Sequence, residues 1–506
     1  MARLAIDCGN NYIQIVGVLD SEKDKVVPLM DTNHPEGFLS YIAWNGEKFV
    51  TGPELFNSPK LRSVSEGLLK NRLAEQITLT KPGGKVKTEI SGKEALRFVI
   101  KEAVLRANKV LYEVYRENCT GVTLAYPASW LSNQRLNLIR TLDGMQITDK
   151  LKINVTGTIS EPAAGGLSYV QHIKEKNPFN VLVIDVGAGT TDVSIVRVMP
   201  EGQKSENGKT YYYDIIATGG LSDTAGSNFT RKMADLLRKK ISEEGPDVPK
   251  VPDFLIMEQA EKCKIALTAG TSAEPSFIGT DGMMLDISVS REEYEKAIEA
   301  DVEKIVECAS KIRSMHKDAP VDAVVLTGGG SQVPMIARRV REKMTDIPAG
   351  RIEAHDPSMA IAKGTAAYAT DEGGVIQRII YDIAIEYYEG DTDNKIAETF
   401  ITAGTQLPVT KTRLMRSRTR FANTYTISPI MEAHTLTPDP SQPRRDYDEI
   451  FVARYDFRHE VPAGTIMEEY MSVDKNNVLH YYVKDPSDDT RKAEEATIQL
   501  LHVGEG

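Results

Sequence analysis

The fold is decided by a stretch that reads LVIDVGAGTTD and covers residues 182–192. It predicts an apolar strand that ends at Asp185 and then turns through small residues. Glycine and alanine in such a turn let backbone N–H groups approach a phosphate closely. A second β-branched run follows at residues 193–198, so we predict a hairpin whose tip faces an anion.

The same pattern stands at the start of the chain. The stretch LAIDCGNN covers residues 4–11, and a second β-branched run follows at residues 13–18. A single aspartate-x-glycine turn after a strand is more often a plain turn than a ligand site. Two such turns in matched contexts favour a ligand site over a plain turn. We expect the two tips to face each other and to hold a nucleotide phosphate chain from both sides.

An aspartate before each turn suits this ligand, although phosphate is itself negative. A phosphate chain in a closed site needs Mg²⁺, which keeps several waters and is held through one or two carboxylates. Asp7 and Asp185 fit that role, and Asp192 or Glu161 could orient an attacking water. The groups that we expect to contact the β- and γ-phosphoryl oxygens belong to Gly9, Asn10, Asn11, Ala188, Gly189 and Thr190.

A third glycine-rich turn follows later in the chain. Residues 323–327 predict an apolar strand, three glycines occupy residues 328–330, and Pro334 suits the first turn of a helix. Three glycines leave no Cβ atom to keep a flat nucleoside away from the backbone. A glycine run can also be a plain linker, but the strand before it and the helix after it favour a binding turn.

These three segments, in this order and at this spacing, resemble the phosphate-one, phosphate-two and adenosine motifs of the actin-like ATPase superfamily. Within it, the chain is most similar to the heat-shock protein seventy, or DnaK-type, chaperones. Further likeness lies in residues 122–128, 159–164, 226–229 and 261–268, so that it extends over residues 2–370. The resemblance implies an α/β fold with a two-lobed, ribonuclease-H-like nucleotide-binding domain, followed by an all-β sandwich domain.

The resemblance also implies a site for ATP or ADP with Mg²⁺, and it allows K⁺. It implies that Asp7 and Asp185 hold Mg²⁺ through water, and that Lys70 contacts phosphate. Glu161, Thr190 and Asp192 would surround the hydrolytic water, while Glu261, Lys264 and Thr268 would contact ribose and adenine. The other nucleotide contacts that it implies are Gly9, Asn10, Asn11, Tyr12, Gly187, Ala188, Gly189, Gly226, Gly328, Gly329, Gly330 and Gln332.

Several positions depart from the family pattern. Asn10 and Asn11 replace two threonines, and Ile265 replaces an arginine that stacks on adenine, a loss of roughly 0.5 to 2 kcal/mol of binding. Gly157 replaces an arginine that serves J-domain communication, so stimulation by a J-domain partner is in doubt. The remaining departures are Ala188 for the middle glycine of phosphate-two, and Gly330 and Gln332 for serine and arginine.

The chain of 506 residues is too long for one core. We expect a nucleotide-binding domain at residues 1–372, a linker at 373–386, and at 387–506 a substrate-binding-like β-sandwich without a helical lid. Residues 94–115 and 291–315 predict amphipathic helices. The β-domain is similar to the peptide-binding half of the same chaperones, above all at residues 400–409. Its expected strands are residues 380–388, 398–409, 418–427, 449–457, 466–473, 478–483 and 497–503.

Composition excludes several other classes. The net charge of −11 and the absence of a long basic run disfavour nucleic acid as a partner. No run of 18 apolar residues and no signal sequence are present, so we expect no membrane partner and a cytoplasmic protein. The four cysteines form no Cys-x-x-Cys pair, which indicates neither a zinc site nor a disulfide framework.

We therefore expect a slow ATPase of the chaperone type that binds an unfolded peptide or a protein client through its β-domain. A nucleotide-exchange factor is a further implied partner. The main alternative is a nucleotide-stabilised scaffold or co-chaperone with little turnover, which Asn10, Ala188 and Ile265 favour. Filament-forming actin relatives and sugar kinases share the same motifs, but the β-rich tail argues against both.

Overall fold

The computed structural model describes residues 2–22, 25–29, 37–171, 177–204, 210–244, 250–280, 282–370, 374–390, 392–417, 423–475 and 477–484. The chain forms two compact units. The first comprises residues 1–129, 138–213 and 218–375. The second comprises residues 376–506 together with the short segments 130–137 and 214–217.

The first unit contains two sheets with the same construction. In each, an antiparallel hairpin is joined on one side by two parallel strands, in the orders β3-β2-β1-β9-β12 and β15-β14-β13-β20-β21. The strands of the first sheet are β1 (Ala2–Cys8), β2 (Tyr12–Leu19), β3 (Lys25–Pro28), β4 (Phe38–Leu39), β9 (Cys119–Tyr126) and β12 (Val155–Ser160). Those of the second are β13 (Phe179–Val186), β14 (Thr191–Lys204), β15 (Thr210–Leu221), β20 (Ala323–Thr327), β21 (Ile352–Ala354) and β22 (Val375–Ile376). The two predicted hairpins are thus confirmed, and they occupy equivalent places in two matching sheets.

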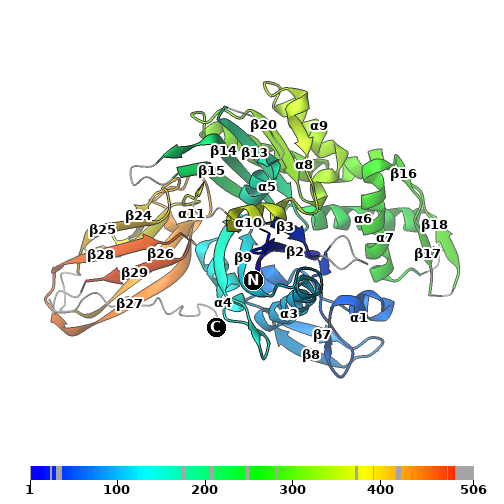
Figure 1. The fold of residues 1–506 in the computed structure, drawn as a ribbon, viewed down its shortest axis with the longest axis horizontal. Coiled ribbons are helices and arrows are strands. Elements are labelled where there is room, and N and C mark those ends of the chain that lie inside the picture. The colour runs from blue at the N-terminus through cyan, green and yellow to red at the C-terminus, as the bar shows by residue number, and fades with distance from the viewer. Residues whose placement is uncertain are drawn as a thin grey trace. The chain divides into compact units, whose positions relative to one another are not determined.

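Two helices lie between these sheets, and each packs on the sheet that it does not follow along the chain (Figure 1). Helix α5 (Glu161–Val170) follows the first sheet along the chain but packs on β13 and β14 of the second. Helix α10 (Ala360–Thr370) follows the second sheet but packs on β1 and β2 of the first. The two helices pack closely, because an added Cβ atom at Gly364 of α10 would lie 1.6 Å from the Ala164 carbonyl oxygen of α5.

The predicted helices of this unit are observed with one difference. Residues 291–315 form α8 (Arg291–Met315), which begins with a capping box between Ser290 and Glu293. Residues 94–115 do not form one uniform helix. Helix α3 (Gly92–Val110) ends in a π-helical turn, η2 (Leu111–Tyr115).

Smaller elements complete the list. Near the first sheet they are β5 (Ala43–Trp44), β6 (Phe49–Val50), α1 (Gly52–Phe56), α2 (Pro59–Arg62), η1 (Leu69–Arg72), β7 (Gln76–Thr80), β8 (Lys87–Ser91), α4 (Ser132–Leu142), β10 (Gln146–Thr148) and β11 (Leu151–Lys152). After β15 they are α6 (Gly226–Glu243), α7 (Asp253–Ala269), β16 (Ser272–Ala273), β17 (Ser276–Ile278), β18 (Met284–Asp286), β19 (Val289–Ser290), η3 (Gly329–Gln332), α9 (Pro334–Lys343) and η4 (Ala349–Arg351).

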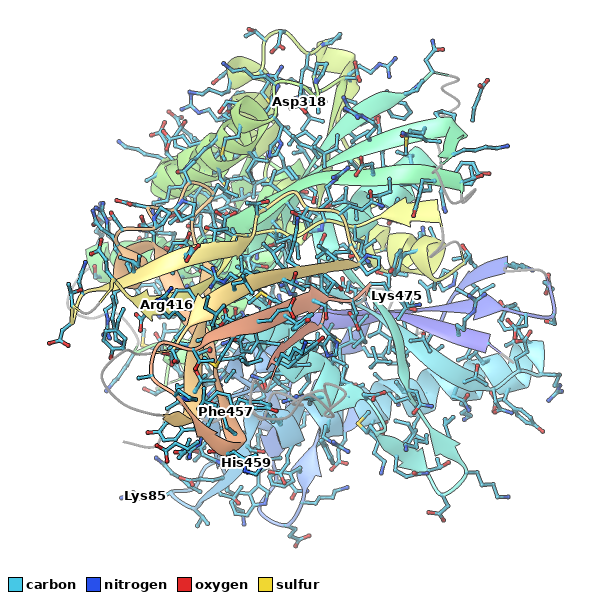
Figure 2. All side chains as sticks on the ribbon, turned by 90° about the vertical axis from the view of Figure 1, so that its left-hand side faces the viewer. Lys85, Asp318, Arg416, Phe457, His459 and Lys475 are labelled. Atoms are coloured by element: carbon cyan, nitrogen blue, oxygen red, sulfur yellow. The ribbon has the colours of Figure 1, made fainter. Side chains whose placement is uncertain are left out.

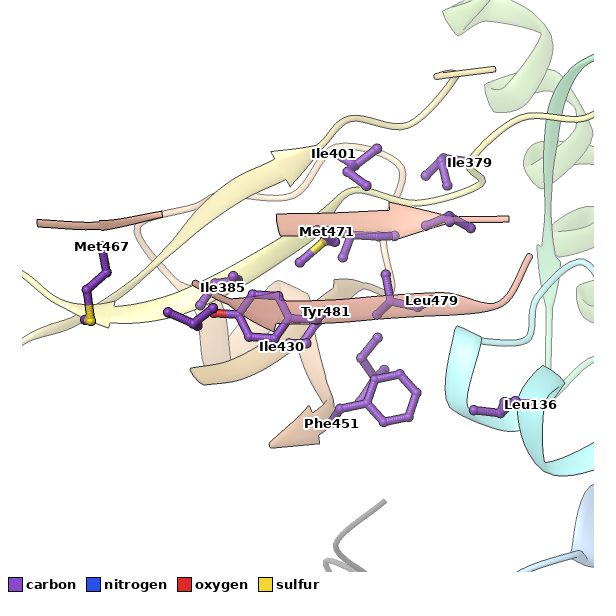
Figure 3. Close-up of a cluster of buried hydrophobic side chains, with 14 of the residues drawn as sticks. Leu136, Ile379, Ile385, Ile401, Ile430, Phe451, Met467, Met471, Leu479 and Tyr481 are labelled. Carbon is purple, nitrogen blue, oxygen red and sulfur yellow. The ribbon is translucent and has the colours of Figure 1, made fainter. Parts of the chain in front are cut away.

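The second unit is a sandwich of two antiparallel sheets, in the orders β24-β23-β26-β27 and β25-β28-β29. Its elements are β23 (Ile383–Tyr388), β24 (Lys395–Ile401), β25 (Val409–Arg416), β26 (Asn423–Ala433), α11 (Pro443–Asp446), β27 (Tyr447–Val461), β28 (Ile466–Val473) and β29 (Leu479–Val483). The inner faces are apolar, and Ile385, Ile430, Met471 and Tyr481 lie together between the strands (Figure 3).

Some predicted strands of this unit need correction. Strand β24 begins and ends earlier than predicted, because residues 402–408 form a turn. Strand β25 was missed, since Arg413 interrupts the apolar alternation of its sequence VTKTRLMR. The predicted strand at 497–503 and residues 418–422 lie outside the described residues.

No helix in the described part of the chain combines the length and the apolar character that a membrane span requires.

Candidate active site

The tips of the two matching hairpins meet. Asp7 is the last residue but one of β1, and Asp185 holds the same place in β13, so each strand ends one residue later than predicted. Asp185 is the cross-strand partner of Asp192 on β14. Asn10 follows the first hairpin strand, and its Nδ2 atom would lie 1.9 Å from a Cβ atom added to Gly189 in the second turn. A larger residue at position 189 would therefore force the Asn10 side chain to move.

A cluster of buried carboxylates lies at this meeting point. Oxygen atoms of Glu161, Asp185 and Asp192 lie within 4.8 Å of one another. Asp7 and these three residues are each less than a tenth exposed. Lys70 of η1 is also buried, and its Nζ donates to Glu161 Oε1 at 2.6 Å. Since isolated buried charges are costly, the pair of Lys70 and Glu161 anchors the cluster.

Hydrogen bonds hold two of the carboxylates in place. The Thr190 hydroxyl donates to Asp192 Oδ2 at 2.7 Å, and the backbone N–H of Ser129 donates to Asp192 Oδ1 at 2.9 Å. The Thr327 hydroxyl donates to Asp185 Oδ1 at 2.9 Å. Because these donors come from β20 and from two loops, the orientation of each carboxylate depends on several parts of the unit.

The carboxyl groups have strongly perturbed pKa values. Burial, followed by the negative charge of Glu161, raises the pKa of Asp7 to about 7, although Lys70 acts against this shift. Burial and Glu161 also raise the pKa of Asp192 to about 7, although Thr190 and Ser129 act against it. The pKa of Asp185 is raised well above its ordinary value by the same two causes. The pKa values are raised because the carboxylates are buried and because their negative charges are not balanced by positive charge within the cluster.

The residues of this cluster fit a magnesium ion. Mg²⁺ prefers carboxylate and water oxygens, and it usually takes one or two protein carboxylates together with phosphate oxygens. Three of the four buried carboxylates, those of Asp7, Glu161 and Asp192, interact with the ammonium group of Lys70, so added positive charge would relieve the repulsion that remains in the cluster. Asp7 and Asp185, at the ends of equivalent strands, are suited to hold such an ion from the two sheets.

The glycines at 328–330 have different structural roles. Gly328 has φ of +79°, and an added Cβ atom would lie 2.4 Å from the Val186 carbonyl oxygen. An added Cβ atom at Gly330 would lie 2.7 Å from a methyl group of Val186. Gly329 has no neighbour within 4 Å of such an atom. Two of the three glycines are thus required by packing against β13, and Gly329 alone presents an open face.

Helices α6 and α7 bring together the residues expected to contact ribose. Lys264 Nζ lies 2.7 Å from Glu261 Oε2 and donates to the Thr230 hydroxyl at 2.9 Å. Gly226 starts α6, and its N–H donates to the Gly187 carbonyl at 2.9 Å. The second turn is therefore attached to the start of α6, close to the pair of Glu261 and Lys264.

Other predicted contacts lie outside these networks. The Thr268 hydroxyl donates to the Ile265 carbonyl of its own helix, and Ile265 is 60% exposed. Gln332 is exposed at the end of η3. Asn11 accepts a hydrogen bond from the Tyr41 hydroxyl at 3.0 Å. Gly9 forms the first turn, Tyr12 begins β2, and Ala188 accepts a backbone hydrogen bond from the start of α6.

Four contributors were missed by the sequence analysis. Ser129 and Thr327 orient Asp192 and Asp185, Thr230 contacts Lys264, and Asn71 lies beside Gly189. Ser129 and Thr327 directly adjoin motifs that were recognised, so that position along the chain could have pointed to them. Thr230 follows residues 226–229 and Asn71 follows Lys70, but position alone could not show their roles, because these depend on which helices and turns meet.

Two matching sheets whose hairpin tips meet at buried carboxylates define the actin-like class of two-lobed nucleotide-binding domains, here followed by a β-sandwich. The family model described as Hsp70 protein matches residues 71–441, and the chain belongs to the Hsp70 family. It is 21% identical over 430 residues to the chaperone protein HscA of Buchnera aphidicola subsp. Baizongia pistaciae, covering 81% of this chain and 79% of that protein. It is 26% identical over 397 residues to the chaperone protein dnaK of Gracilaria tenuistipitata var. liui, covering 76% of this chain and 59% of that protein.

Proposed function

We propose that this Hsp70-family chain is a slow ATPase that binds ATP and ADP with Mg²⁺, and whose nucleotide state changes the exposure of a client-binding surface. In this proposal residues 1–372 bind nucleotide, residues 373–386 are the linker, and residues 387–506 bind an unfolded peptide or a protein client. A nucleotide-exchange factor would be a further partner. The meeting of the two hairpin tips at a buried carboxylate cluster is the single observation that carries the proposal.

The chain's own groups suit this chemistry. Backbone N–H groups of the two turns would contact the phosphate oxygens, and Lys70 would supply a fixed positive charge beside them. Asp7 and Asp185 would hold Mg²⁺, which neutralises developing phosphate charge when bound. Asp192 is suited to accept a proton from an attacking water, because Thr190 and Ser129 fix its orientation.

Single-turnover hydrolysis of radiolabelled ATP by the full chain tests this role. Removing a positioned general base typically costs about 10²- to 10⁴-fold in rate, and we expect that loss for Asp192→Asn. Asp318→Asn, which changes an exposed carboxylate after α8, is the matched control and should keep the rate of the unaltered protein. Unchanged hydrolysis by Asp192→Asn would remove Asp192 from the mechanism.

A scaffold that binds nucleotide with little turnover is the second candidate. The position of Asn10 favours it. This side chain is only 4% exposed, contacts the Gly189 turn, and keeps its Oδ1 atom without a hydrogen-bond partner among the described residues. An amide that bridges the two turns would compete with a terminal phosphate for the same space. Tight ATP binding without phosphate release would favour this candidate over the ATPase.

A further inference from the structure

A charged group lies inside the β-sandwich of the second unit, where an apolar residue is expected. Glu469 on β28 is fully buried, and its neighbours on the same face of that strand are Met467 and Met471. It accepts hydrogen bonds from the hydroxyl groups of Tyr387 and Tyr481 and, at 3.0 Å, from Arg413 Nε on β25. The carboxylate of Glu469 is therefore well satisfied within the unit.

The guanidinium of Arg413 is much less well satisfied. Its Nη1 and Nη2 atoms are buried and have no hydrogen-bond partner among the described residues. Nη1 lies 3.4 Å from Glu398 Oε2, without hydrogen-bond geometry. The guanidinium carbon lies 4.5 Å from the centre of the Tyr387 ring and 4.4 Å from that of Phe400. Unpaired buried donors are costly, so a group that accepts from them would gain binding free energy.

This guanidinium lies between β25 and β24, the edge strands of the two sheets as far as the structure describes them. Strand β25 is the edge of the three-stranded sheet, and β24, which carries Glu398, is the edge of the four-stranded sheet. The Glu398 side chain is 66% exposed, so it can move into solvent at little cost. Figure 2 faces this unit and labels Arg416 at the end of β25. A carboxylate that took the place of Glu398 would therefore reach the same nitrogen, Nη1.

The charged residues of β25 indicate which kind of ligand group could take the place of Glu398 beside Arg413. Its sequence VTKTRLMR contains Lys411, Arg413 and Arg416 and no acidic residue. A carboxylate offers Nη1 both an acceptor oxygen and the negative charge that pairs with a guanidinium, and the flanking rings hold the plane of the group in place. A neutral amide could accept from one nitrogen but could not bring the compensating negative charge.

We propose that Arg413 binds a carboxylate of a client peptide at the edge between β24 and β25, and that Glu398 is displaced when this peptide binds. This proposal rests on the proposed client binding by the β-domain. It assigns to that domain a preference for segments in which an acidic residue is flanked by apolar ones. The apolar flanking residues would contact the exposed faces of the same strands.

Fluorescence anisotropy with the full chain tests the proposal. The probes are a short fluorescein-labelled peptide of leucine and threonine with one central glutamate, and the same peptide with glutamine in its place. We expect about tenfold tighter binding of the glutamate peptide, because the charge-assisted contact with Arg413 is lost with glutamine. Glu398→Gln should tighten binding of the glutamate peptide roughly threefold to tenfold and leave the glutamine peptide unchanged, since it removes the competing charge.

Arg413→Lys should abolish the preference, with a thermal melt to check that the variant remains folded. Glu398→Gln provides a test that does not depend on this check, because it changes an exposed side chain. If both peptides bind equally well, or if Glu398→Gln leaves the preference unaltered, the carboxylate site is refuted while client binding stands. If neither peptide binds, the proposed client binding fails and the carboxylate site fails with it.

Discussion

Replacing Gly364 with alanine should damage both the stability of the first unit and its active site. Gly364 lies where α10 contacts α5, and the added Cβ atom would lie 1.6 Å from the Ala164 carbonyl oxygen. Real Cβ atoms essentially never approach a non-bonded atom within 3.0 Å. The two helix backbones must therefore separate by roughly 1.4 Å, the difference between these distances, in a region that is close-packed.

This separation has a cost that can be estimated. Overpacking of a core typically costs about 1 to 3 kcal/mol, and the upper end applies here because the obstacle is backbone rather than a flexible side chain. In a unit of this size about 3 kcal/mol corresponds to a fall in melting temperature of roughly 4 °C. Glu161 starts α5, so its carboxylate would move as well, and a misplacement of about 1 Å can lower turnover by about 10²-fold.

Scanning calorimetry and single-turnover hydrolysis measure these two effects on the full chain. Gly350→Ala is the matched control, because a Cβ atom added there meets nothing within 4 Å. We expect the control to melt and to turn over like the unaltered protein. If Gly364→Ala behaves like Gly350→Ala in both assays, the close contact between α5 and α10 does not exist in solution and the reasoning is refuted.

Three further substitutions test the site itself. Lys70→Met should destabilise the first unit by about 3 to 5 kcal/mol, because it leaves Glu161 buried without its partner; an unchanged denaturation midpoint would contradict this. Thr327→Val keeps the side-chain shape but removes the donor to Asp185, so the free energy of unfolding should fall by about 1 kcal/mol in chemical denaturation. Ile265→Arg places a guanidinium at an exposed position of α7, and calorimetric titration should find ADP binding tightened by roughly 0.5 to 2 kcal/mol. Equal affinity would mean that adenine does not lie beside residue 265.

Much of the geometry of the candidate site could be predicted because its parts are local. The strand, aspartate and small-residue turn of each hairpin lie within about a dozen consecutive positions, and period-two patterns and turn residues act over that distance. The order of the motifs then indicated the family, and the family model supports it. The glycines at 328–330 were recognised for the same reason, although two of them prove to be required by packing.

Other features could not be read from a local pattern. Strand β25 was missed because inward-facing Arg413 interrupts the apolar alternation, and its burial beside Glu469 depends on a strand more than fifty positions away. The short contact between Asn10 and Gly189 likewise joins two turns that are far apart in the chain.

The amino-acid sequence by itself determined the two hairpins, their aspartates and the change to a β-rich second part, because these follow from short-range periodicity and turn chemistry. The tertiary structure alone decided that the two tips meet, that Lys70 pairs with Glu161 over 91 positions, and that Gly364 lets two helices touch. Such contacts depend on how whole sheets and helices pack, since burial and close approach are properties of the assembled fold and not of any single segment.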